Sequence, residues 1–252
     1  MSATNTRAIL LYLHTRTMHS YKKDFPIFEN NPGLIYLDSA ASTQKPSHVI
    51  DGMTHFLKSS YANIHRGAYS LSEISEDLYF ASKKKVANLV LNCSTEEIIY
   101  TYNATYAYNM LAQTLWYSWV LQSWDTVLID IAEHHANIVP WQMLSQRHGI
   151  IVERLDLDND YNYNIQDFQK KYHNRVKVVS LSAASNVTWT LYNIQAISEL
   201  LRPETFLIID WSQAIPHTSI DVKKWRIDAL VCTAHKIMAD TWLWILYLAK
   251  NH

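Results

Sequence analysis

The chain has 252 residues, of which 48% are hydrophobic and 18% charged, so it can bury the core of one large domain or of two small ones. These proportions exclude an intrinsically disordered, collagenous or low-complexity chain. The 22 Lys and Arg residues balance 23 Asp and Glu residues, for a net charge of −1. We therefore expect neither nucleic acid nor a membrane surface as the partner, and a small ligand instead.

The cysteines and the N-terminus indicate the compartment. Cys93 and Cys232 lie far apart and belong to no Cys/His cluster, which disfavours a disulfide framework and a structural zinc site. The apolar run over residues 8–13 is too short for a secretory signal or a membrane span. We expect a cytoplasmic protein with a loose N-terminal extension over residues 1–19 and one domain over residues 20–252.

Regular secondary structure is predicted from residue 47 onward. Apolar residues recur at helical spacing over residues 47–61, and Ser70 with Glu73 forms a capping-box pattern ahead of a second helix. Short β-rich runs, mostly separated by helical stretches, then predict strands at residues 97–101, 126–130, 149–155, 176–181, 206–210, 229–233 and 245–248. Such apolar strands are typical of a sheet buried on both faces, so we expect an α/β fold with a mostly parallel mixed sheet flanked by helices. The chain stops directly after a strand, which indicates an incomplete domain.

Polar side chains follow three of the predicted strands. They are His134, Asp210, Gln213, Thr233, His235 and Lys236. Because the carboxyl ends of parallel strands meet at one edge of a sheet, we expect these side chains to line one crevice. An Asp that keeps a pyridine nitrogen protonated and a Lys that forms a Schiff base are what a pyridoxal phosphate (PLP) enzyme needs. Taken singly, each residue is equally well explained as a helix cap or a surface group.

Several motifs in a consistent order strengthen the PLP interpretation. They are YLDSAASTQKP (36–46), HRGAYSLS (65–72), EHHANIVPWQML (133–144), SNVTWT (185–190), DWSQAIPH (210–217) and TAHK (233–236). Together they strongly resemble SUF-type cysteine desulfurases of the aminotransferase class-V family. The resemblance implies the large domain of a fold-type I PLP-dependent transferase, without the family's small C-terminal domain. It also implies L-cysteine as substrate, alanine as product, a homodimer, and an acceptor protein that takes the sulfur as persulfide for iron–sulfur cluster assembly.

The same resemblance implies a role for individual residues. Lys236 would be the Schiff-base lysine, Asp210 the partner of the pyridine nitrogen, and His134 the residue stacked on the ring. The residues implied to hold the rest of the cofactor are Asn186 and Gln213 at its phenolic oxygen and Thr105, Thr233 and His235 at its phosphate. Those implied to lie near the substrate are Ala41, His65 and Asn186. No metal is implied.

The chain also departs from the family. Its phosphate turn reads Asn-Ala-Thr-Tyr-Ala over residues 103–107, where the family resembles Gly-Thr-Thr-Glu-Gly, so one hydroxyl donor is lost. The family's persulfide-forming cysteine and its substrate-binding arginine lie beyond the last residue of this chain, and Cys93 and Cys232 are predicted to be packing residues. Open alternatives are a selenocysteine lyase, another class V lyase or epimerase, a non-catalytic PLP-binding remnant, and, least favoured, a metal site at Glu133–His135.

Glycine is scarce and tryptophan abundant. There are 4 Gly and 9 Trp, although average usage predicts about 18 Gly. Five tryptophans stand where the family has glycine: Trp124, Trp189, Trp211, Trp242 and Trp244, with Trp116 and Trp119 as further candidates. Overpacking and left-handed backbone at the five sites would cost on the order of 5–25 kcal/mol, so the literal sequence is expected to fold poorly. Our hypothesis is that UGA codons read as glycine in the source organism were translated as tryptophan; UGG codons would refute it and favour genuine substitutions in a decaying gene.

Overall fold

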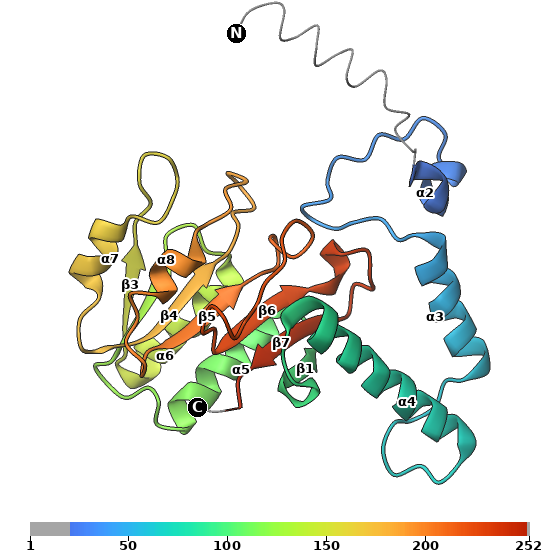
Figure 1. Cartoon of the computed structure of the whole chain (residues 1–252), viewed down its shortest axis with the longest axis horizontal. Coiled ribbons are helices and arrows are strands. Elements are labelled where there is room, and N and C mark those ends of the chain that lie inside the picture. Colours follow the sequence, from blue (N-terminus) through green and yellow to red (C-terminus); the bar gives the residue numbers. More distant parts are fainter. Residues whose placement is uncertain (1–20, 251–252) are drawn as a thin grey trace, which may run out of the picture.

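A computed structural model describes residues 21–250 (Figure 1), so the predicted extension over residues 1–19 lies outside the described residues. The helices are α2 (Pro26–Asn30), α3 (Ser47–Ser59), α4 (Ser70–Lys85), α5 (Ala104–Tyr117), α6 (Val139–His148), α7 (Ile165–Lys171) and α8 (Ile194–Ser198), with a π-helical turn at Val86–Leu91. The strands are β1 (Ile98–Thr101), β2 (Thr126–Asp130), β3 (Ile151–Leu155), β4 (Val176–Ser182), β5 (Phe206–Asp210), β6 (Ala229–Thr233) and β7 (Trp244–Leu248).

All the predicted strands are confirmed, each with ends within two residues of the prediction. They form one sheet in the order β1-β7-β6-β5-β4-β2-β3. The strands from β2 to β6 pair in parallel, whereas β7 is antiparallel to both of its neighbours, β1 and β6. The carboxyl ends of β2, β4, β5 and β6 therefore share one edge with the amino end of β7.

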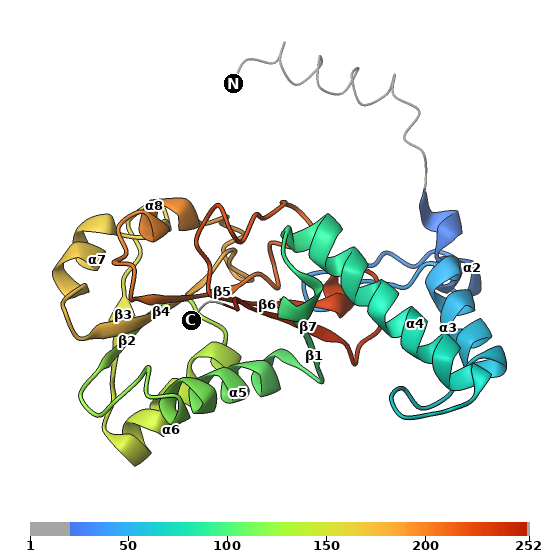
Figure 2. The same cartoon turned by 60° about the horizontal axis from the view of Figure 1, so that its bottom comes forward.

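Helices cover both faces of the sheet (Figure 2). Val127 and Ile129 of β2 pack in the core formed with α5 and α6, which also contains Trp141. Leu128, between them, packs in the opposite core with Phe168 of α7. Successive side chains of a strand point to opposite faces, so one apolar strand serves both cores. This is the predicted α/β fold, with a sheet buried between helices.

Helices α3 and α4 extend away from the sheet (Figures 1 and 2). No residue of α3 is buried. The capping box predicted for α4 is wrong: the residue before the helix is Tyr69, no side chain caps the first turn, and Ser70 is already helical. A capping box is present farther along the chain, where Ser94 and Glu97 cap a 3-10 helix (Thr95–Glu97). Within residues 21–250, no helix combines the length and apolar character that crossing a membrane requires.

The tryptophans at family glycine positions differ in backbone conformation. Trp119, Trp124 and Trp189 have φ of 65°, 72° and 62°, in the left-handed region that favours glycine. Their side chains, like that of Trp242, are between 66% and 77% exposed. The predicted overpacking is therefore wrong at Trp124, Trp189 and Trp242, because their indoles project into solvent. Trp211, by contrast, is buried.

Candidate active site

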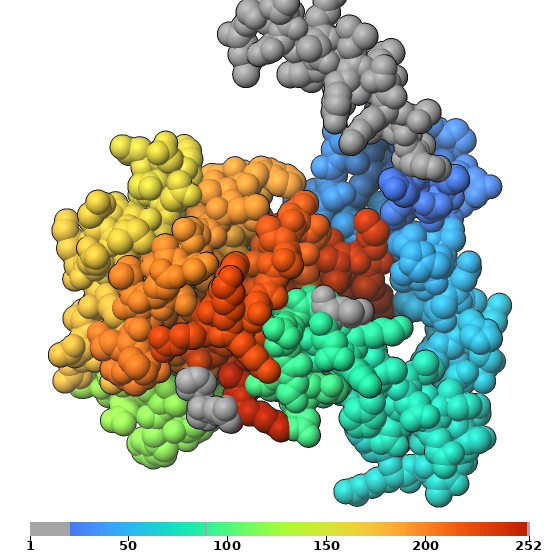
Figure 3. Space-filling view, in the orientation of Figure 1, coloured from blue at the N-terminus to red at the C-terminus, as the bar shows by residue number. Residues whose placement is uncertain are grey.

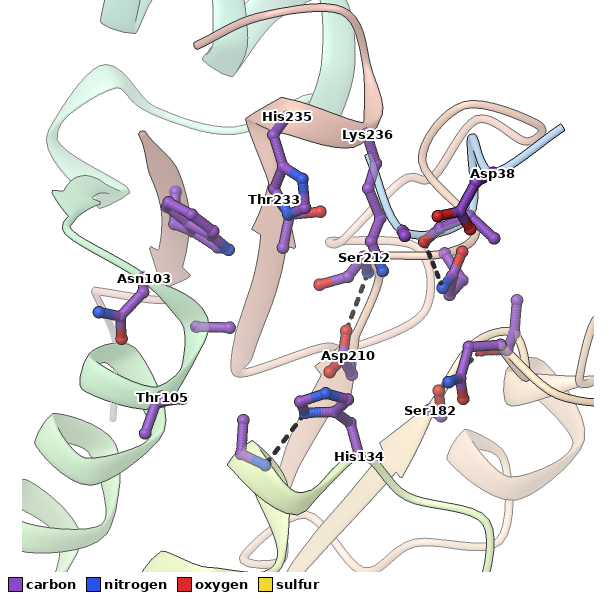
Figure 4. Close-up of a pocket in the computed structure, with 18 residues that line it drawn as sticks. Asp38, Asn103, Thr105, His134, Ser182, Asp210, Ser212, Thr233, His235 and Lys236 are labelled. Atoms are coloured by element: carbon purple, nitrogen blue, oxygen red, sulfur yellow. Dashed lines mark hydrogen bonds between the residues drawn. The ribbon is translucent and has the colours of Figure 1, made fainter. Parts of the chain in front are cut away.

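A cavity of about 460 Å³ lies at the edge where the carboxyl ends of the parallel strands meet (Figure 4). The cavity is lined by nine of the residues that the sequence predicts for the site: Ala41, Thr105, His134, Asn186, Asp210, Gln213, Thr233, His235 and Lys236. Residues from the loop after α2, the start of α5 and the ends of β2, β4, β5 and β6 therefore meet in one place. The topology brings them together because each follows, or precedes, an element that ends at this edge.

Lys236 and Asp210 lie close enough to interact electrostatically. Asp210 ends β5, is 6% exposed and accepts a hydrogen bond from the Ser212 backbone N–H at 2.9 Å. Lys236 follows β6, and Figure 4 shows its side chain extending toward Ser212 and Asp210. Burial lowers the pKa of the Lys236 ammonium, and the Asp210 carboxylate opposes part of that effect. The lysine is thus closer to its neutral, nucleophilic form than an exposed lysine would be.

The orientation of His134 is fixed by the backbone that follows it. Its Nδ1 accepts a hydrogen bond from the Ala136 N–H at 3.1 Å, at the start of a short 3-10 helix (Figure 4). An accepting Nδ1 leaves Nε2 as the protonated nitrogen of the neutral ring. The ring of His135 lies at 84° to that of His134, with centroids 6.4 Å apart, so the two imidazoles do not converge on one metal.

Buried hydroxyl groups at the cavity lack protein partners. The Oγ of Ser212 and the Oγ1 of Thr233 are buried and make no hydrogen bond, although both residues line the cavity. Helix α5 also directs its N-terminus here; Asn103 caps it by accepting from the Tyr106 N–H at 2.7 Å. Unpartnered hydroxyls and a helix N-terminus suit an anionic group such as phosphate. With the Lys, Asp and His, these residues fit PLP.

The segment over residues 38–45 is hydrogen-bonded to the turn after β6 that carries Lys236. The Thr43 hydroxyl donates to the His235 carbonyl at 2.7 Å and accepts from the Met238 N–H at 2.8 Å. The Gln213 side chain donates to the Ala40 carbonyl at 3.1 Å. These contacts hold Ala41 at the cavity even though its segment precedes the first strand of the sheet.

His65, which is expected to approach the substrate, lies outside this cavity, and its role near the substrate stays a prediction. It does not line the cavity of this one chain; its Nδ1 lies 3.3 Å from Glu76 Oε1, and its ring packs against Tyr79 and Phe80. The reason is the position of α3 and α4, which carry the HRG motif away from the sheet edge.

The sequence interpretation missed several cavity residues, among them Ser182, Ser212 and Trp244. Ser182 and Ser212 end or follow predicted strands, so the rule that found Asp210 could also have found them. Trp244 begins β7, and only the antiparallel direction of that strand brings it to this edge. It pairs with Thr101 and Thr233 in the sheet, and its ring lies 5.1 Å from that of His235.

Both cysteines are buried, as expected for packing residues. Cys232 is fully buried within β6, and burial raises its pKa strongly. Cys93 is 8% exposed, and burial, together with the charge of Glu97, raises its pKa to about 11. A nucleophilic cysteine needs an accessible thiolate, so neither residue can serve as one.

The chain matches the aminotransferase class-V family over residues 35–252. It is 35% identical to a cysteine desulfurase of Synechococcus elongatus over 91% of this chain and 37% of that protein, and 33% identical to a probable cysteine desulfurase of Halalkalibacterium halodurans over 93% and 58%, respectively. The chain therefore belongs to the aminotransferase class-V family, whose members include PLP-dependent enzymes. It spans about half the length of the curated relatives it matches.

Solved structures agree with the fold. The apo cysteine desulfurase of Thermococcus onnurineus NA1 superposes with a TM-score of 0.85 at 27% identity, over 94% of this chain and 58% of that one. The cysteine desulfurase CsdA of Escherichia coli gives a TM-score of 0.80 at 29% identity, over 91% and 57%. The predicted fold class, the large domain of a fold-type I PLP enzyme, is therefore confirmed.

Proposed function

We propose that this chain binds PLP and forms the cofactor-binding part of a cysteine desulfurase that converts L-cysteine to L-alanine. One observation carries the proposal: Lys236 and Asp210 line a single cavity together with buried hydroxyls that have no protein partner. The similarity to cysteine desulfurases favours this reaction over that of a selenocysteine lyase or another class V enzyme.

Each side chain has a task in the proposed reaction. When bound, PLP supplies an electron-accepting ring that makes the Cα proton of an amino acid acidic. Asp210 would hold a proton at the ring nitrogen, and His134 would cover the ring and exclude water from it. Lys236 would bind the cofactor through its neutral amine, and its Nζ would be the group that accepts the Cα proton. Thr105, Ser212 and Thr233 would donate hydrogen bonds to the phosphate.

Sulfur transfer needs a thiolate from outside residues 21–250, because both cysteines there are buried. In the proposed step this thiolate attacks the substrate Sγ. The new S–S bond forms as the Cβ–Sγ bond breaks, and the electron pair of the broken bond passes to carbon, which gains a proton to give alanine. The persulfide is then passed to an acceptor protein of iron–sulfur cluster assembly, which we place in the reducing cytoplasm.

The test is to load the 252-residue protein with PLP and record its visible absorbance. We expect an absorbance band that Lys236→Ala abolishes and that borohydride reduction fixes on the peptide containing Lys236. Lys58→Ala, at an exposed position of α3, is the matched control and should keep the band. A band retained in Lys236→Ala would contradict the proposal. PLP binding without release of alanine from cysteine would favour a non-catalytic binding protein.

We further propose that the protein forms a homodimer through α3 and α4. Figure 3 shows the surface of residues 26–85 standing out from the rest of the molecule. It carries apolar side chains that are between 41% and 89% exposed, namely Ile35, Leu37, Ile50, Met53, Leu57, Leu71, Ile74 and Leu78. A large number of exposed apolar side chains on one segment indicates an interaction site. A second copy is the occupant to which the family resemblance points.

The dimer is tested by sedimentation equilibrium. Leu57→Lys is expected to shift the protein toward the monomer, because a charge on the apolar face would be desolvated on association. Tyr117→Lys, at a 72% exposed position at the end of α5, is the control and should not change the mass. A monomeric wild-type protein at high micromolar concentration would overturn this proposal.

A further inference from the structure

Three buried carboxyl groups interact with one another, and one of them, Asp210, lines the cavity. Asp130 ends β2, Glu133 follows it by three residues, and Asp210 ends β5; they are 0%, 7% and 6% exposed. Glu133 interacts electrostatically with each of the other two. Like charges in a poorly solvated interior oppose one another, so the three groups are not all ionised. The hydrogen bonds indicate which of them holds a proton.

Asp130 and Asp210 are provided with partners for a carboxylate. Oδ1 of Asp130 accepts from the Ala132 N–H at 2.7 Å, and Oδ2 accepts from the Ser182 N–H at 3.0 Å and the Tyr163 hydroxyl at 3.1 Å. Asp210 accepts from the Ser212 N–H and lies near the Lys236 ammonium. Burial raises the pKa of Asp130, but its hydrogen-bond donors oppose that effect, so its pKa is raised less than that of Glu133.

Glu133 has less support. Both of its carboxyl oxygens are buried and make no hydrogen bond of good geometry, and the nearby donor that lowers its pKa is the Asn137 side chain. The titratable groups that face it are Asp130 of β2, Asp210 of β5, Tyr108 of α5 and the tyrosines 163 and 192, and none of them is a cation. The Asn137 side chain is the other polar neighbour. Burial first, and then the charges of Asp130 and Asp210, raise the pKa of Glu133 well above its usual range.

We propose that Glu133 is the member of this cluster that stays a neutral carboxylic acid in the folded protein. Glu133 acts through Asp210 and does not touch the cavity, so it is a positioning residue. An ionised Glu133 would place a second negative charge beside Asp210 and weaken the proposed hold of Asp210 on the ring nitrogen. This last consequence rests on the proposed function, whereas the charge state of Glu133 does not.

The protein without cofactor provides the first test. Because the folded-state pKa is raised, the folded protein retains a proton on Glu133 that the unfolded chain releases above its ordinary pKa of about 4.3. Wild-type stability should therefore fall, relative to that of Glu133→Gln, as the pH rises from about 4 toward 8. The melting temperature of Glu133→Gln minus that of wild type should grow over this range.

Glu97 offers a matched control within the same chain. It is also buried, at 8% exposure, but its oxygens accept from the backbone N–H groups of Ser94 and Lys250 at 2.7 and 3.2 Å. Glu97→Gln should destabilise the protein, because an amide cannot accept both hydrogen bonds. A Glu133→Gln variant whose melting temperature does not gain on that of wild type as the pH rises would overturn the proposal, since it would mean that Glu133 is ionised in the folded state.

A measurement on the wild-type protein covers the case in which a variant does not fold. With glutamate labelled at the side-chain carboxyl with ¹³C, one resonance should keep the shift of a protonated acid at pH 7. If every resonance has the shift of a carboxylate, the proposal is wrong. In the PLP-loaded protein, Glu133→Gln should leave the pH midpoint of the visible absorbance unchanged; a shifted midpoint would show that a charge had been removed. Failure to bind PLP would refute the proposed function and leave the charge state standing.

Discussion

Trp124 has a backbone conformation that an L-residue adopts only at a cost. Its φ is 72°, and the left-handed region costs a residue with a Cβ about 1–2 kcal/mol, whereas glycine adopts it freely. A hydrogen bond of 2.9 Å from the Trp124 N–H to the Gly149 carbonyl ties this turn to the end of α6. The side chain itself is 67% exposed, so the strain lies in the backbone and not in packing.

Two substitutions at this position separate the strain from the side chain. Trp124→Ala and Trp124→Gly both remove the indole, but only the glycine relieves the left-handed strain. Trp242 is the matched control, because it is 75% exposed and its φ is not positive. At Trp242 glycine should be less stable than alanine by about 0.4–1 kcal/mol, for entropic reasons alone.

The glycine-minus-alanine difference in unfolding free energy should therefore be about 1–2 kcal/mol more favourable at Trp124 than at Trp242. For a domain of this size that corresponds to roughly 2–8 °C in melting temperature. Scanning calorimetry of the four variants measures it directly. Equal differences at the two positions would refute the argument that the backbone at Trp124 requires glycine.

Three further predictions concern cysteines, cofactor and pH. Cys93 and Cys232 should resist a thiol reagent at pH 8 in the native protein and react only after unfolding, because burial raises both pKa values. The indole of Trp244 lies beside His235 and lines the cavity, so Trp244→Gly should tighten PLP binding about tenfold or more, equivalent to about 1.4 kcal/mol. An absorbance titration measures this, and an unchanged affinity would contradict it. Although burial opposes it, the Asp156 N–H and the Lys171 ammonium lower the pKa of Asp167. Asp167→Asn should therefore destabilise the protein at pH 7, and urea titrations should show this loss disappearing as the pH falls below about 3.9.

The strands could be predicted because their apolar runs are long and bounded by polar residues. Phe206–Asp210 is buried along its whole length, and this explains why its apolar sequence was recognisable. Hydrophobic patterning carries no information on strand direction, however. The antiparallel insertion of β7, and with it the place of Trp244 at the cavity, could not be derived from the sequence.

The site residues that follow strands could be predicted from the sequence. Those whose position depends on contacts between distant segments could not. Asp210 and Lys236 follow apolar strands, so one topological rule places both at the same edge. The position of His65 depends on where α3 and α4 lie, which no local pattern specifies, and its role near the substrate stays a prediction. The burial of Glu133 beside two other carboxyl groups is likewise invisible in a sequence, since it results from several elements packing together.

The position of β7 in the sheet has a consequence for how the protein is made. Strand β1 is at the edge and pairs only with β7, so its backbone groups find no neighbour until residues 244–248 have left the ribosome. Joining β1 to the sheet closes the longest loop between any two paired strands, and such closures are slow. During synthesis β1, the first strand of the sheet to be made, is thus among the last to form its hydrogen bonds with a neighbouring strand. A substitution that weakens β7 releases two strands instead of one.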